Sequence, residues 1–276
     1  MPPGKPGQSW RAAGLALAAL SCAACSEGPT PEANEIVSVA VRGTSFQAVD
    51  SKGNIRRSKD LVGSVLRVRL GKSIARIRID AVAPDAGGSS DVLLHKISIA
   101  SPDGHWRPLC KPAPDGARTG FPMRGRWAAN GQLGDSGPGE FEIVCAAGAQ
   151  GKCVRLGYRP WQRLPDKSSM LPVFNACVRM MRADYSGRGL PTTEDGTLIA
   201  FSDKFGINGK PFDKPFEFEA GWDELGAVCV HHPRIRGVAL KQIEASSPRL
   251  KGRTGKSCSP ERAEALGALI FNGSRA

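Results

Sequence analysis

The fold is decided by the stretch Val65-Leu-Arg-Val-Arg-Leu-Gly-Lys-Ser-Ile-Ala-Arg-Ile-Arg-Ile79. In both Val65–Leu70 and Ile74–Ile79, apolar residues alternate with arginines. A period of two is typical of a half-buried strand, with apolar side chains on one face and polar side chains on the other. The intervening Gly71-Lys72-Ser73 predicts a hairpin turn. The stretch therefore predicts two antiparallel strands that place arginines on their outer face.

Similar patterns extend this prediction over the first half of the chain. Turn residues such as Asp50-Ser-Lys-Gly53 separate the strand-like segments. Further strands are expected at 37–41, 43–49, 92–99 and 140–145. Many short strands with turns between them favour an antiparallel sheet or sandwich, which we place at residues 41–145.

The period changes after Cys145, where residues 146–157 contain a short predicted helix. A second helical face, with spacings of three, four and seven, is formed by Phe174, Cys177, Val178 and Met181. Strands are predicted at 196–201, 216–220 and 226–231. A last helix should begin at Pro260 with Ser259 as its N-cap. Its apolar face would consist of Ala263, Leu266, Leu269 and Ile270. The fold class is therefore α+β, with a β-rich first part at 41–145 and a mixed part at 146–276.

Residues 1–25 are typical of an export signal, because Lys5 and Arg11 precede an apolar run that is too short to span a bilayer. The run ends in small residues before Cys25, as in a bacterial lipoprotein, where that cysteine carries the lipid. Cys22 is the alternative lipidation site, and simple cleavage or an uncleaved anchor are further alternatives. Residues 26–40 follow as a polar, proline-containing linker. This organisation predicts an exported, lipid-anchored protein of the cell envelope, either periplasmic or attached to the outer membrane.

Eight cysteines are present, and two of them belong to the export segment. The remaining six are Cys110, Cys145, Cys153, Cys177, Cys229 and Cys258. An even number in an exported chain predicts disulfide bonds, although the sequence does not choose among the pairings. None of the six forms a C-x-x-C pair, so we expect neither a metal site nor a redox cofactor.

The net charge of +12 makes an anionic ligand of the envelope a candidate partner, beside the membrane that the lipid anchor would enter. The basic residues are scattered along the sequence and do not form a single run. No nucleic-acid-binding signature is present, so no nucleic-acid partner is expected.

Several blocks then match one family in order. They are Trp106–Cys110, Gly151–Trp161, Ala176–Tyr185, Glu194–Thr197 and Ala227–Val230. Together they resemble the bacterial ADYC domain family, over roughly residues 40–275. The family motif corresponds here to Ala183-Asp184-Tyr185-Ser186. The resemblance implies an exported or lipid-anchored protein and a fold, but it does not imply a reaction.

The chain departs from the family motif at Ser186, which replaces the cysteine. If that cysteine were a nucleophile, this protein would lack it. If it were half of a disulfide, its partner should be missing too, and the even number of remaining cysteines favours this second interpretation.

The candidate site residues are compatible with two functions. Arg182, Asp184, Tyr185 and Asp195 are candidates for a polar network or a ligand site. A non-enzymatic binding or structural module is the first hypothesis. The alternative is an envelope hydrolase that acts on polysaccharide or peptide through Asp184 and Asp195. A Cys229–His231 nucleophile pair is a weaker candidate, because Cys229 is expected to be oxidised.

Overall fold

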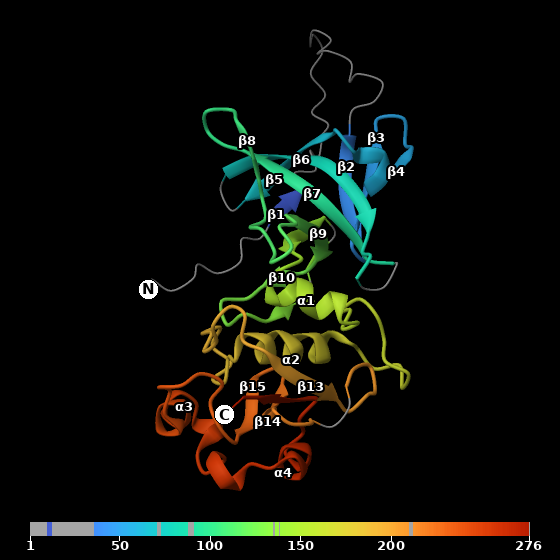
Figure 1. Ribbon diagram of the computed structural model, residues 1–276. Helices are drawn as coiled ribbons and strands as arrows, with labels where there is room; N and C mark the ends of the chain where they lie inside the picture. Colours follow the sequence, from blue (N-terminus) through green and yellow to red (C-terminus); the bar gives the residue numbers. More distant parts are fainter. Residues whose placement is uncertain are drawn as a thin grey trace, which may run out of the picture. The chain divides into compact units, whose positions relative to one another are not determined.

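The computed structural model describes the chain as two compact units (Figure 1). The described residues are 10–12, 36–70, 73–87, 91–134, 136–137, 139–209 and 212–275. Within them, the N-terminal unit comprises residues 10–126 and 134–148, and the C-terminal unit comprises residues 127–133 and 149–275. Residues 127–133 thus belong to the C-terminal unit although they precede residue 145.

Most of the expected export segment lies outside the described residues, including Cys22 and Cys25. Its residues Trp10–Ala12 form the short strand β1, which pairs with β5 and β12. The expected linker also lies largely outside the described residues. Its last part, 36–40, belongs to strand β2 (Ile36–Arg42), because this segment pairs with the following strand β3.

The N-terminal unit is built from antiparallel strands, as the alternating pattern predicts. One sheet has the order β6-β5-β1-β12-β9-β7-β8, and it closes on itself because β6 also pairs with β7. Its other strands are β5 (Val65–Leu70), β6 (Ser73–Pro84), β7 (Leu93–Ala100), β8 (Trp106–Pro108), β9 (Thr119–Arg124) and β12 (Glu140–Cys145). A second sheet joins β2, β3 (Ser45–Asp50) and β4 (Ile55–Arg57), and the 3-10 helix η1 (Ser58–Leu61) follows it.

The core of this unit comes from the inward positions of these strands. Leu66 and Val68 of β5 and Ile77 and Ile79 of β6 are buried, as the period of two predicts. They pack with Phe46, Phe141 and other apolar residues in one cluster. Burial of each large apolar side chain contributes about 1.5–3 kcal/mol, so this row of side chains fixes the register of the β5–β6 hairpin.

The C-terminal unit contains a four-stranded antiparallel sheet in the order β13-β16-β14-β15. The strands are β13 (Ile199–Asp203), β14 (Glu217–Asp223), β15 (Gly226–Val230) and β16 (Ile270–Ser274). The helices are α1 (Ala149–Arg155), α2 (Leu171–Arg182), α3 (Leu240–Ser246) and α4 (Pro260–Ala265). Helices α2 and α4 lie on opposite sides of the sheet (Figure 1). The short strands β10 (Arg126–Trp127) and β11 (Leu133–Gly134) pair with each other.

The predicted last helix is correct at its start but wrong at its end. Ser259 caps α4, because its hydroxyl accepts a hydrogen bond from the backbone N–H of Arg262 at 3.2 Å. The helix ends at Ala265, and Gly267 adopts a φ of +89°. Ile270, which we expected on the helical face, begins strand β16 between β13 and β14.

All six body cysteines form disulfides, which confirms that prediction. Cys110 pairs with Cys145 in the N-terminal unit. Cys153 pairs with Cys177 and joins α1 to α2, and Cys229 pairs with Cys258 and joins β15 to the residues before α4. The α+β, β-rich and disulfide-containing fold is therefore as predicted. Among the described residues, no helix is long and apolar enough to cross a membrane.

A buried histidine stands out in the core of the N-terminal unit. The Nε2 atom of His95 lies 2.8 Å from the hydroxyl of Ser58, which also accepts a hydrogen bond from the backbone N–H of Phe46 at 2.8 Å. Both side chains are fully buried, so no substrate can reach this serine–histidine pair. Burial lowers the pKa of His95 to about 4, against the opposing effect of hydrogen bonds with the backbone of Leu93 and Gly120.

This depressed pKa predicts an acid-sensitive N-terminal unit. In the unfolded chain His95 becomes protonated near the ordinary histidine pKa of 6.5, whereas in the folded chain it stays neutral down to about pH 4. Stability should therefore fall as the pH is lowered from 6.5 to 4, by up to roughly 3 kcal/mol. Urea unfolding followed by circular dichroism at a series of pH values measures this. A His95→Gln variant should show a shallower dependence in that window.

The exposed His105 provides the matched control. Replacing His105 by Gln should leave the pH dependence unchanged. An equal effect of the two substitutions would contradict the role of buried His95.

Candidate functional site

The family-like motif lies at the C-terminal end of α2, in the C-terminal unit. Ala183 caps the helix in a left-handed conformation, with a φ of 46° and a ψ of 44°. This conformation is uncommon for a residue other than glycine. Hydrogen bonds hold it, because the backbone N–H groups of Ala183 and Asp184 donate to the carbonyls of Met180 and Arg179. The chain therefore turns sharply after α2, and Asp184 and Tyr185 point into the interior.

Asp184 is fully buried and its carboxylate is occupied. Arg179 of α2 pairs with it at 2.5 Å, and the backbone N–H of Gly189 donates to it at 2.7 Å. The same guanidinium donates to the backbone carbonyls of Asn130 and Glu224. Asp184 thus holds the loop that follows α2 and has no surface open to a substrate.

Tyr185 belongs to a second buried network, which reaches across the sheet. Its hydroxyl donates to Glu219 of β14 at 2.9 Å and accepts from the backbone N–H of Arg234 at 2.9 Å. Arg234 forms two hydrogen bonds of 3.0 Å with the Glu219 carboxylate, and Asn272 of β16 donates to the same carboxylate at 2.7 Å. Trp222 donates to Asn272 at 2.7 Å. Burial and the nearby Glu219 raise the pKa of Tyr185 well above its ordinary value.

These contacts tie the motif to the sheet through side chains and backbone alike. The aromatic ring of Tyr185 stacks on Trp222, with centroids 5.2 Å apart. Gly187 has a φ of +70°, and a Cβ there would come within 1.7 Å of the Leu225 carbonyl oxygen. Because the turn between β14 and β15, which contains Leu225, lies this close, residue 187 must be a glycine. Ser186 makes one long side-chain contact, 3.4 Å to Asp184.

The four candidate residues do not form one site. Arg182 is partly buried and donates to the backbone carbonyl of Gly189 at 2.6 Å. Asp184 and Tyr185 belong to the two buried networks, whereas Asp195 is exposed in a turn. No hydrogen bond between Asp184 and Asp195 is found in the described part of the chain. Sequence reasoning missed Glu219, Arg234 and Asn272, because each looks like an ordinary polar residue of a strand or loop.

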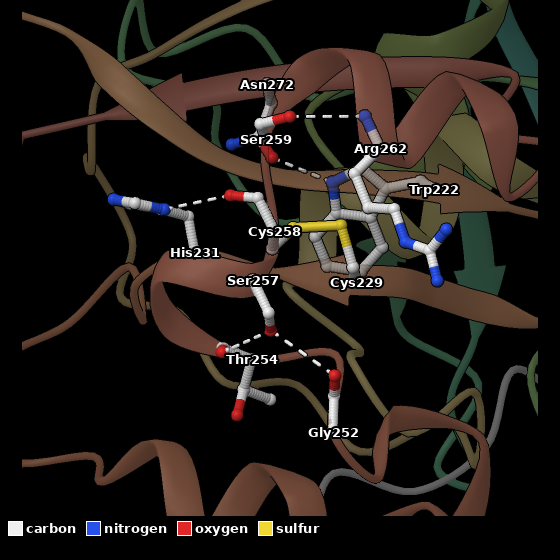
Figure 2. The surroundings of a disulfide bond; sticks show 10 residues. All are labelled: Trp222, Cys229, His231, Gly252, Thr254, Ser257, Cys258, Ser259, Arg262 and Asn272. Carbon is white, nitrogen blue, oxygen red and sulfur yellow. Dashed lines mark hydrogen bonds between the residues drawn. A yellow bond between two sulfur atoms is a disulfide. The ribbon is translucent and has the colours of Figure 1, made fainter.

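The surroundings of the Cys229–Cys258 disulfide exclude the cysteine–histidine pair (Figure 2). Cys229 is oxidised, so it provides no thiolate. The Nδ1 atom of His231 lies 2.9 Å from the backbone carbonyl of Cys258, which orients the ring as a structural contact (Figure 2). The His231 side chain thus braces the segment that leads into α4.

A cavity of about 690 Å³ opens on the α4 side of the sheet. Ligand sites commonly have volumes of 300–1,000 Å³. Four of the chain's ten phenylalanines line this cavity, and each is only half-buried: Phe212, Phe216, Phe218 and Phe271. The rings of Phe212 and Phe218 are stacked 6.3 Å apart. Gly273 makes room for Phe212, because a Cβ at Gly273 would lie 3.2 Å from that ring.

Polar residues also line this phenylalanine cavity. Asp203 lines it, but its carboxylate is occupied by the Tyr158 hydroxyl and by three backbone N–H groups. Lys204 and Glu264 are exposed and also line the cavity. A cavity lined by four phenylalanines together with polar residues suits the binding of an apolar ligand better than acid–base chemistry. The three phenylalanines within residues 212–218 are a local sign of this cavity in the sequence, but Phe271 comes to it from a distant strand.

The described residues contain no group of three or more histidine, cysteine, aspartate or glutamate side chains arranged to hold a metal ion.

Comparison with known proteins gives one match. The family model of the ADYC domain matches residues 58–236. This range includes the motif, Glu219 and Arg234, and it ends before α4. The chain matches no curated protein and no solved structure.

The buried network predicts a strong effect of Glu219 on stability. A Glu219→Gln variant leaves the buried Arg234 cation without its counter-charge, which should cost about 3–5 kcal/mol. Tyr185→Phe removes a hydrogen bond and should cost about 1–2 kcal/mol. Urea unfolding measures both changes. Asp195→Asn, at an exposed site, should change stability by less than about 0.5 kcal/mol. A Glu219→Gln cost as small as that of Asp195→Asn would contradict the network's role.

Proposed function

Because the chain belongs to the ADYC domain family, we propose that it is an exported, lipid-anchored binding module of the cell envelope and not an enzyme. The phenylalanine cavity is its ligand site in this proposal. The observation that carries the proposal is the contrast between this accessible aromatic cavity and the sealed motif.

The environment of the acidic residues supports binding over hydrolysis. A hydrolase that uses two carboxylates needs both of them to face one substrate. Asp184 is buried in an ion pair, and Asp195 lies in an exposed turn. The alternative hydrolase therefore has no supporting geometry in the motif.

The disulfides and the N-terminal sequence support export. Three disulfides persist in an oxidising compartment and are rare in a reducing cytosol. Residues 1–25 have the basic start, the short apolar run and the small residues before Cys25 that export requires. A lipid on Cys25, or on Cys22, would hold the folded units at a membrane surface.

Ligand binding in the phenylalanine cavity is testable with N-phenyl-1-naphthylamine, a neutral fluorophore that brightens in apolar sites. The probe should bind the full chain, and Phe216→Ala should weaken binding roughly tenfold through lost apolar contact. Fluorescence titration measures both. Phe205, a half-buried phenylalanine that does not line the cavity, gives the control Phe205→Ala, which should bind as the parent does. Absence of probe binding, or equal losses in both variants, would count against the cavity as a ligand site.

Lipid anchoring is testable at the two N-terminal cysteines. Cys25→Ala should abolish incorporation of labelled fatty acid and release the protein into the soluble fraction of the producing cells when the membranes are washed with high salt, which removes electrostatic binding. Cell fractionation and metabolic labelling measure this. Loss of label only in Cys22→Ala would move the lipid to that residue, and label in neither parent nor variants would refute the anchor.

A further inference from the structure

The outer face of the β5–β6 hairpin gathers arginines that are scattered in the sequence. The two strands pair in a register that sets Arg67 directly opposite Arg76, and Arg69 opposite Ile74. Because the residues between them point into the core, these side chains share the outer face of the β5–β6 hairpin. We call this surface the arginine face. It consists of Val65, Arg67, Arg69, Ile74, Arg76, Arg78 and Trp106.

The arginine face carries charge that the protein itself does not neutralise. Like charges directly opposite each other destabilise a strand pair, and Arg67 and Arg76 form such a pair. Arg78 is paired with Asp80 at 2.5 Å. For Arg67, Arg69 and Arg76, the described residues provide no acidic partner. The fold tolerates this repulsion, and an anionic surface placed against the hairpin would relieve it.

Apolar and aromatic side chains are interspersed with these arginines. Val65 is 46% exposed and Ile74 is 60% exposed, although both lie on regular strands. Trp106 of β8 is half-buried beside them, with the guanidinium carbons of Arg78 and Arg76 at 4.7 Å and 5.7 Å from its ring centroid. Tryptophan and arginine favour the boundary between lipid headgroups and hydrocarbon, and exposed aliphatic side chains gain by entering it. A bilayer accounts for the exposure of Val65 and Ile74 as well as for the arginines, whereas charge attraction alone accounts only for the arginines.

We propose that the arginine face docks directly onto a bilayer surface that carries anionic phospholipids. This inference goes beyond the proposed ligand binding, because it concerns the N-terminal unit and does not involve the phenylalanine cavity. The arginines bind the headgroup phosphates, and Trp106, Val65 and Ile74 contact the outer part of the acyl layer. The N-terminal unit would then hold a fixed face toward the membrane, whether or not a lipid anchor is attached.

The test uses the full chain with Cys22→Ala and Cys25→Ala, so that no lipid contributes to binding. Sedimentation with vesicles of phosphatidylcholine containing phosphatidylglycerol should show binding that falls as salt is raised. Each arginine near such a surface contributes about fivefold in affinity, so Arg67→Gln with Arg76→Gln should weaken binding roughly 25-fold. Ile74→Ser should weaken it by about threefold to tenfold, through lost apolar contact.

A matched variant distinguishes binding by the arginine face from a general effect of the net charge. Lys251 and Lys256 are exposed in the C-terminal unit, and replacing both by Gln removes the same charge. This control should lose less than about threefold in vesicle affinity. The inference is overturned if the control and the arginine variant lose affinity equally. It is also overturned if Ile74→Ser binds vesicles normally while an oligonucleotide binds the arginine face more tightly than vesicles do.

Discussion

The C-terminal unit depends on one buried carboxylate, that of Glu219. Its side chain is fully buried in β14, where an unpaired charge would cost several kcal/mol. Arg234, Tyr185 and Asn272 satisfy it, and they come from three other segments of the chain. The sheet, the end of α2 and the segment after β15 must therefore all be in place together. Apolar packing alone would allow these elements to shift relative to one another, whereas the hydrogen bonds of this network are satisfied in a single arrangement.

This dependence explains what the family motif does in this protein. Asp184 and Tyr185 are residue types that often act in catalysis, but each is committed to holding α2 against its neighbours. Ser186 has only one long contact, so a serine replaces the motif cysteine at little structural cost. The motif therefore identifies a fold, and function has to be sought on surfaces that the motif does not form.

Local pattern was enough to predict much of the fold, and the failures have a common physical cause. The β5–β6 hairpin and α2 follow from periodicity over a few residues, and Ser259 marks the start of α4 by its capping chemistry. Strand β16 was missed because its apolar residues continue the spacing of the preceding helix. It is a strand because its backbone pairs with β13 and β14, which lie far from it along the chain, and its Asn272 bonds Glu219 from 53 residues away. Partners at such separations leave no periodic trace, so neither the network nor the phenylalanine cavity could be assembled from the sequence.

The β5–β6 hairpin shows how one pattern serves stability and recognition at once. Its inward positions are constrained by the core, because Leu66, Val68 and Ile77 are buried. Its outward positions carry no such constraint, and solubility requires only that they be polar. Arg67 opposite Arg76 destabilises the strand pair, and the exposed Val65 and Ile74 do not favour solubility. A surface that destabilises the isolated protein is explained by a partner that relieves the destabilisation. The charge together with the apolar exposure is why we propose an anionic bilayer as that partner.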